Sequence, residues 1–166
     1  MGKNIEWPVD ETGRGLGGKG NAGIVSIIMN TPYSIGYVEL SYAIRYRLDT
    51  ALLKNKAGYF VEPNTTTIMA AGKYAASKLI PFDPRGDYSR ELEAIIYVGG
   101  KLSYPITCFT HIFIWTKYPG EKAEAIKEFL SWLAGPGNHY IIPGYAPLPG
   151  ALRKIIALAA EIIGEG

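Results

Sequence analysis

The chain has 166 residues, enough to bury a hydrophobic core of its own, so one compact domain is the default expectation. Hydrophobic residues make up 48% of the sequence and charged residues 19%, a balance typical of globular rather than disordered proteins. The 17 basic and 15 acidic residues give a net charge of +2 with the basic residues scattered, which argues against nucleic-acid binding.

Several further features narrow the class of protein. Cys108 has no second cysteine to pair with, and its apolar neighbours favour a small core side chain. No run approaches the roughly 18 apolar residues that a membrane-spanning helix needs, and residues 1–7 lack the apolar core of a signal peptide. Taken literally, the sequence predicts a soluble protein made in the cytoplasm. The absence of glutamine suggests a thermophile source.

The first third of the chain begins with a glycine-dense loop over residues 10–23. Apolar residues at helical spacing then predict a helix that ends near Asn30, with Asn21 as its N-cap. Residues 34–39 read as a short strand, and residues 40–48 as a short helix.

The rest of the chain alternates extended and helical patterns. Residues 50–62 look extended around a turn, and Asn64 or Thr65 can cap a helix that reaches Leu79. Residues 81–104 are rich in turn residues. The run Ile106–Trp115 is mostly β-branched or aromatic and predicts a buried strand. Two helices follow, one with an apolar stripe that Gly135–Gly137 ends and one from Gly150 onward; their expected apolar residues are Ala123, Ile126, Phe129, Leu130 and Leu133, and Leu152, Ile155, Ile156, Leu158, Ala159 and Ile162. This alternation predicts an α/β protein with a mixed sheet flanked by helices.

The glycine loop partly matches two nucleotide-binding patterns. Residues 15–20 fit G-x-G-x-x-G with Glu39 at a suitable distance, but the residues before the loop make a poor buried strand. Residues 13–19 fit G-x-x-x-x-G-K, but Gly20 stands where the pattern needs a magnesium-binding hydroxyl. Glycines that only permit a tight loop explain the same residues. Alternatively, the helix N-terminus and Lys19 could face an anion. The candidate ligand-binding residues are Gly17, Gly18, Lys19, Gly20 and Asn21.

Catalytic and metal-binding patterns are scarce. His111 lies within the apolar run, where a hydrogen-bonded core histidine is expected, and His139 follows a glycine-rich loop, where an exposed position is expected. No metal-ligand spacing occurs, and the acidic residues between 83 and 93 alternate with arginines as on a solvated surface. The sequence therefore predicts a protein that is not an enzyme, with no cofactor and no metal.

The order of several motifs resembles the phosphate-binding protein of the high-affinity phosphate ABC importer, the PstS family. The matching stretches cover nearly the whole chain and are weakest between about residues 79 and 103. They are Trp7-Pro8, GLGGKGNAG over 15–23, TPYSIGYVE over 31–39, Tyr42-Ala43, Tyr104-Pro105-Ile106, Phe129-Leu130 with Trp132, and GYAPLP over 144–149.

The resemblance implies a type II periplasmic-binding-protein-like fold whose two lobes close on one phosphate. It implies that residues 1–104 are a lobe-two-like α/β segment and that residues 105–166 return to lobe one. The family's main ligand residues lie before the Trp-Pro motif, so we expect this chain to be its C-terminal portion, with an incomplete ligand site. The glycine loop matches a family segment that is more structural than ligating.

The expected partners are phosphate or a similar anion, an ABC permease, and no nucleic acid. We also expect a homo-oligomer or a complementing N-terminal portion. The resemblance implies an extracellular, periplasmic or cell-surface location. The alternative is a protein-interaction or assembly module, derived from a solute-binding lobe, that does not bind phosphate. An enzyme that uses the loop on a phosphorylated substrate lacks an accompanying base or nucleophile.

Overall fold

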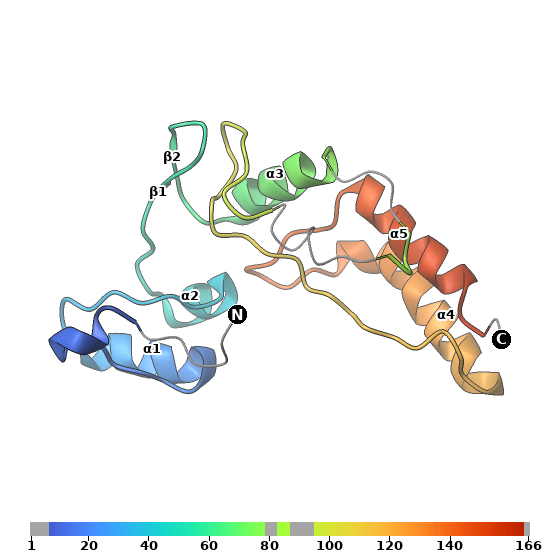
Figure 1. The fold of residues 1–166 in the computed structure, drawn as a ribbon, viewed down its shortest axis with the longest axis horizontal. Coiled ribbons are helices and arrows are strands. Elements are labelled where there is room, and N and C mark those ends of the chain that lie inside the picture. The colour runs from blue at the N-terminus through green and yellow to red at the C-terminus, as the bar shows by residue number, and fades with distance from the viewer. Residues whose placement is uncertain (1–6, 79–82, 87–94, 165–166) are drawn as a thin grey trace. The chain divides into compact units, whose positions relative to one another are not determined.

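The computed structural model describes residues 7–78, 83–86 and 95–164. It divides the chain into two compact units, residues 1–49 and residues 50–166 (Figure 1). Each unit has its own local packing, so each is described by itself. The proposed division at residue 104, which concerns the lobes of a larger fold, stays a prediction.

Unit 1 is built from two short helices and the extended chain between them. The 3-10 helix η1 (Asp10–Thr12) precedes the glycine loop, and helices α1 (Gly20–Asn30) and α2 (Leu40–Tyr46) pack together around the buried Val25 and Ala43. Both helices confirm the helical patterns in the sequence. Helix α2 ends at Arg47, whose left-handed backbone, φ 53°, lets its N–H donate to the carbonyls of Ala43 and Ile44.

The segment 34–39 is not a strand in this structure, contrary to the sequence prediction. It runs beside α1 at Gly36, where a Cβ would lie 2.9 Å from Ile28 Cδ1, so a larger residue would require the Ile28 side chain to shift. Tyr33, Ile35 and Tyr37 point to solvent at alternate positions. The segment lacks strand structure because no other extended segment among the described residues of unit 1 pairs with its backbone.

Unit 2 begins with a short antiparallel hairpin, as the extended pattern over residues 50–62 predicts. Strands β1 (Leu53–Lys54) and β2 (Phe60–Val61) pair with Leu53 opposite Val61 and Lys54 opposite Phe60. Helix α3 (Thr65–Ala76) follows, and of the two cap residues that the sequence indicated, Asn64 and Thr65, it is Asn64 that caps it. Asn64 Oδ1 accepts from Thr67 N at 3.0 Å, while Thr67 Oγ1 accepts from Asn64 N at 3.0 Å, which satisfies two amides reciprocally.

The first core cluster of unit 2 lies against α3. Ala71 and Ala75 pack with Ile95 and Val98, and Phe109 covers the group. Gly72 is fully within this packing, because a Cβ there would reach contact distance of Pro149 and Phe109. Thr65 Oγ1 also donates to Tyr145 O at 3.3 Å. The proline-rich stretch near residues 145–149 therefore lies against α3.

The second core cluster joins the two last helices, α4 (Gly120–Ala134) and α5 (Gly150–Glu161), which run side by side (Figure 1). Ala123 and Leu130 pack there with Ala160 and Ile163. The predicted stripes are only partly inside: Phe129 and Leu158 are exposed. Phe129 instead stacks on Trp132, with ring centroids 6.3 Å apart, because it lies at the edge of the buried face.

Between these helices, the 3-10 turn η2 (Pro136–His139) reverses the chain. A Cβ on Gly137 would lie 2.5 Å from Trp132 Cε3, so glycine lets this turn rest on the indole ring. Asn138 then fixes the proline-rich stretch, since its Oδ1 accepts from Leu148 N at 2.8 Å. The glycine-rich end that the sequence predicted for α4 is confirmed.

The run Ile106–Trp115 is the main correction to the sequence prediction, because it is not a strand and, of its ten residues, only Thr107 is buried. One side touches both clusters of unit 2 through Phe109 and Ile114. The other side is open: Ile106 is 69%, Phe113 93% and Trp115 79% exposed. Cys108 is exposed as well, so it is not the core side chain that its neighbours suggested.

The two predicted strands, residues 34–39 and 106–115, fail to form for the same physical reason. An extended segment becomes a strand only when another backbone accepts and donates its hydrogen bonds. Among the described residues the sheet has two strands, β1 and β2, so the chain is a set of helices with one small antiparallel hairpin rather than a mixed sheet. Part of the turn-rich region 81–104 lies outside the described residues.

Candidate functional site in the glycine-rich loop

The glycine loop between η1 and α1 forms because several positions accept no side chain. Gly13, with φ 66°, ends η1 and its N–H donates to Asp10 O at 3.1 Å. A Cβ at Gly15 would overlap the carboxylate of Asp10. These contacts turn the loop back toward η1 before α1 begins.

Gly18 and Gly23 make the closest backbone contact of the loop. A Cβ on Gly18 would lie 2.6 Å from the carbonyl carbon of Gly23, and a Cβ on Gly23 would lie 2.9 Å from that of Gly18. Neither backbone can move aside as a flexible side chain would. The glycines at these positions are therefore required by packing, which supports the structural interpretation of the loop.

Four of the five candidate residues lie at or just before the start of α1: Gly17, Lys19, Gly20 and Asn21. Lys19 is the N-cap, extended at φ −77° and ψ 106°, and Gly20 follows with φ 64°. The amides of Gly20, Asn21 and Ala22 find no acceptor among the described residues, as is usual in a first helical turn. Gly17 precedes them in an exposed position without steric restriction. The arrangement combines free donors, a helix N-terminus and one full charge.

Asn21 has a different role from the one predicted. The helix starts at Gly20 with Lys19 as its N-cap, two residues earlier than predicted, so Asn21 lies within the first turn and does not cap it. Its Oδ1 instead accepts from Glu39 N at 2.9 Å, which ties the start of α1 to the start of α2. Since its oxygen is an acceptor already engaged in this bond, Asn21 is a positioning residue for the loop. No local pattern in the sequence indicates this long-range contact.

The structure does not support either nucleotide-binding interpretation of the loop. No strand precedes the loop in the described part of unit 1, so the strand–loop–helix context of both patterns is missing. The loop is also open, because Gly17, Lys19 and Gly20 are all exposed. An anion held here would stay in contact with water.

The other candidate residues do not form a reactive group. His111 is half-buried rather than in the core and meets Phe109 edge-on at 6.4 Å, whereas His139 is exposed as predicted. Within the described ranges, no three His, Cys, Asp or Glu side chains gather as metal ligands. Of the alternating charges near residue 85, Asp83 accepts from Arg85 N at 2.8 Å, and those from 87 to 93 lie outside the described residues.

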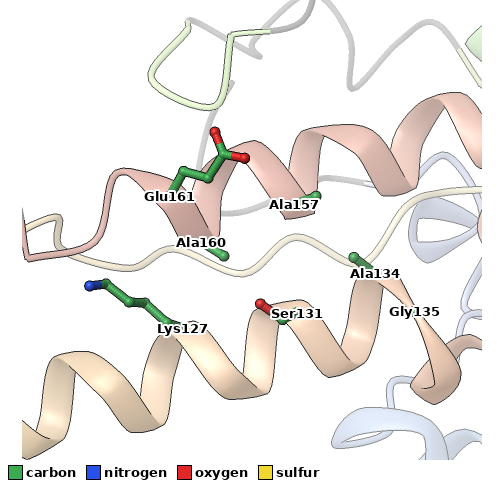
Figure 2. A pocket seen from close by; sticks show the side chains of 7 residues that line it. All are labelled: Lys127, Ser131, Ala134, Gly135, Ala157, Ala160 and Glu161. Atoms are coloured by element: carbon green, nitrogen blue, oxygen red, sulfur yellow. The ribbon is translucent and has the colours of Figure 1, made fainter.

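A groove of about 620 Å³ runs between α4 and α5 in unit 2. It is lined by Lys127, Ser131, Ala134, Gly135, Ala157, Ala160 and Glu161 (Figure 2). Figure 2 shows Lys127 at one end of it, while the carboxylate of Glu161 turns away from α4. Lys127 Nζ lies 3.0 Å from Glu124 Oε1, so its charge already has a partner. The groove offers an apolar floor without a converging set of donors.

Tyr104 is an ionisable residue of unit 2 with a shifted pKa. Burial raises the pKa of Tyr104, whose backbone N–H donates to Thr67 O. This tyrosine lies beside the first core cluster rather than in the glycine loop. Its shift therefore reflects packing in unit 2 and marks no second site.

Comparison with known proteins shows clear relatives. The chain is 43% identical over 171 residues to the phosphate-binding protein PstS of Methanocaldococcus jannaschii, covering 99% of this chain and 43% of the relative. This chain is homologous to part of PstS. The PstS proteins of Pasteurella multocida and Haemophilus influenzae are 33% and 31% identical over 95% and 93% of this chain, and 43% of each relative. The resemblance drawn from the motifs is thereby confirmed.

The chain spans less than half the length of these PstS relatives. No family model and no solved structure matches it. Among the described residues, no helix is both long and apolar enough to cross a membrane. The residues on which the motif resemblance rests have structural positions here: Gly18 and Gly23 pack on each other's backbone, Trp132 supports Gly137, and Tyr145 accepts a hydrogen bond from Thr65 of α3.

Proposed function

We propose that this chain is part of the phosphate-binding component of an ABC-type phosphate transport system, with only part of the ligand site. The observation that carries the proposal is the similarity to PstS, which extends over 99% of the chain at 43% identity. The curated relatives are named as binding proteins, so the chain is a binding module rather than an enzyme.

The number of donors in the described residues supports the proposal of an incomplete site. A dehydrated phosphate needs several converging donors, because each of its oxygens loses water on binding. The glycine loop offers three amides and Lys19, all near solvent. The proposed complete site draws its remaining donors from the larger part of PstS that this chain does not match.

The same proposal accounts for the unpaired extended segments. In a type II periplasmic-binding-protein-like fold, residues 34–39 and 106–115 join a mixed sheet flanked by helices, with residues 1–104 in lobe two and residues 105–166 returning to lobe one. The partners are then phosphate, an ABC permease and the complementing portion, at an extracellular, periplasmic or cell-surface location.

Phosphate titration tests the proposal. We expect a dissociation constant around millimolar or weaker, about −4 kcal/mol, from calorimetry at moderate salt. In a parallel NMR titration, the amide signals of residues 17–22 should shift with phosphate, and Lys19→Ala should reduce these shifts. Lys73→Ala is the matched control, since Lys73 is an exposed lysine on α3.

Two outcomes would count against this account. Micromolar binding would show that the residues present form a complete site. No shift in residues 17–22 at any phosphate concentration would favour the alternative, an interaction or assembly module without phosphate binding. The exposed apolar segment 106–115 is the observation that keeps this alternative open.

A further inference from the structure

Hydrogen bonds from one side chain join two loops of unit 2, the turn of the β1–β2 hairpin and the loop over residues 100–103. Asn55 is 1% exposed, and its Nδ2 donates to the carbonyls of Gly100 at 3.1 Å and Lys101 at 3.0 Å. A third carbonyl, of Ser103, lies at 3.2 Å, and Asn55 Oδ1 accepts from the hairpin's own amides. Figure 1 shows the two loops side by side near the start of α3. One buried amide therefore holds both loops in a fixed relation.

Three lysines and three apolar side chains, all exposed, belong to these loops. We call this surface the lysine tip: Lys54, Lys56, Tyr59, Phe60, Lys101 and Leu102. Lys54 and Phe60 are cross-strand partners, so their side chains share one face of the hairpin. Lys101 Nζ lies 5.2 Å from the centre of the Tyr59 ring, which joins the second loop to the same surface.

The lysine tip has one sign of charge. Residues 50–61 and 95–104 contain no aspartate or glutamate. None of the three lysines forms an ion pair within the described residues. The acidic residues next along the chain on either side of the hairpin are Asp49 and Glu62, and Glu62, which directly follows β2, accepts from Asn64 Nδ2 at 2.9 Å. Positive charge beside exposed apolar groups is thus concentrated at a fixed end of unit 2.

We propose that the lysine tip docks on the surface of a membrane that contains anionic phospholipid. Lysine is a compact point charge that needs no particular partner geometry, which suits mobile lipid headgroups. Protein interfaces, in contrast, are enriched in arginine and depleted in lysine. Tyr59, Phe60 and Leu102 are the kinds of side chain that enter the boundary between headgroups and acyl chains. The association is peripheral and sensitive to salt.

Vesicle sedimentation tests this proposal with the full chain. Vesicles of phosphatidylcholine alone are compared with vesicles that also contain phosphatidylglycerol, each at low and high salt. We expect binding to the anionic vesicles and its loss at high salt. The triple variant Lys54→Ala, Lys56→Ala, Lys101→Ala should bind about a hundredfold more weakly, since each lysine near an anionic surface contributes roughly a fivefold factor.

A matched control variant separates the effect of the lysine tip on vesicle binding from the effect of the total charge of the chain. Lys73→Ala, Lys117→Ala, Lys154→Ala removes the same charge from exposed lysines elsewhere in unit 2, and its vesicle binding should change little. Phe60→Ser should weaken binding without changing its salt dependence. Equal losses in the two triple variants, or no preference for anionic vesicles, would overturn the proposal. Binding to polyglutamate but not to vesicles would also overturn it and assign the tip to an acidic protein. Phosphate titration of the same variants reports separately on the function proposed above.

Discussion

Glycine positions in the loop before α1 differ in what they demand of the backbone. Gly20 has φ 64°, a left-handed conformation that side chains with a Cβ disfavour. Gly18 has ordinary angles but sits against the backbone of Gly23. Gly17 has neither restriction, because a Cβ there would meet nothing within 4 Å. Three neighbouring glycines therefore have three distinct physical roles.

Single alanine substitutions should reveal these roles. Gly20→Ala should lower the free energy of unfolding by about 1 kcal/mol because of its positive φ. Gly18→Ala should cost more, since the two backbones must separate. Gly17→Ala and Lys19→Ala are the controls and should leave stability nearly unchanged. Urea denaturation measures all four; a loss for Lys19→Ala as large as that for Gly20→Ala would make the lysine a structural partner.

Helices that can be recognised from a cap or from apolar spacing in neighbouring residues formed where the sequence predicted them. Helix α3 is the clearest case, because its start is set by two reciprocal hydrogen bonds between Asn64 and Thr67. Neither bond depends on distant parts of the chain. The helices α1, α2, α4 and α5 likewise follow local apolar spacing.

The cap of α3 gives an element-scale prediction. Asn64→Ala should lower the free energy of unfolding of unit 2 by about 1 kcal/mol, since the Thr67 amide loses its acceptor. Asn64→Ser retains a capping oxygen and should recover most of this stability. Thr66→Ala, an exposed change in the same turn, serves as control. Thermal unfolding followed by circular dichroism is the measurement, and equal effects at positions 64 and 66 would contradict the capping role.

At the scale of the whole molecule, the exposed apolar surface of segment 106–115 is the feature that bears on association with other chains. Segment 106–115 contributes Ile106, Ile112, Phe113 and Trp115, and it contains no charged residue that would oppose pairing with another chain. Large apolar patches seldom persist on monomers. A second copy or a complementing portion of a longer protein would cover the same face.

We therefore expect the isolated chain to form a homodimer or higher oligomer, with the segment from about residue 105 onward exchanged or paired between copies. Light scattering coupled to size exclusion, over a hundredfold concentration range, measures this directly. Phe113→Lys should shift the population toward monomer, because a charge would enter the apolar contact. Leu16→Lys, an exposed change in unit 1, is the control. A constant mass of 18.1 kDa would show that the chain needs no partner.

The sequence alone was sufficient for helices α1 to α5, for the β1–β2 hairpin, for a cap of α3 at Asn64 or Thr65, and for the relation to PstS. These depend on local spacing, on capping side chains and on the order of short motifs, all of which are present in neighbouring residues. Tertiary structure decided the rest. The run Ile106–Trp115 has every local property of a buried strand, yet burial and pairing require a second backbone that no local pattern supplies. Asn21 and Asn55 illustrate the same reason at the residue scale. Their amides bond to groups 18 and 45 or more residues away, so only the folded chain shows that one fixes the glycine loop and the other builds the lysine tip.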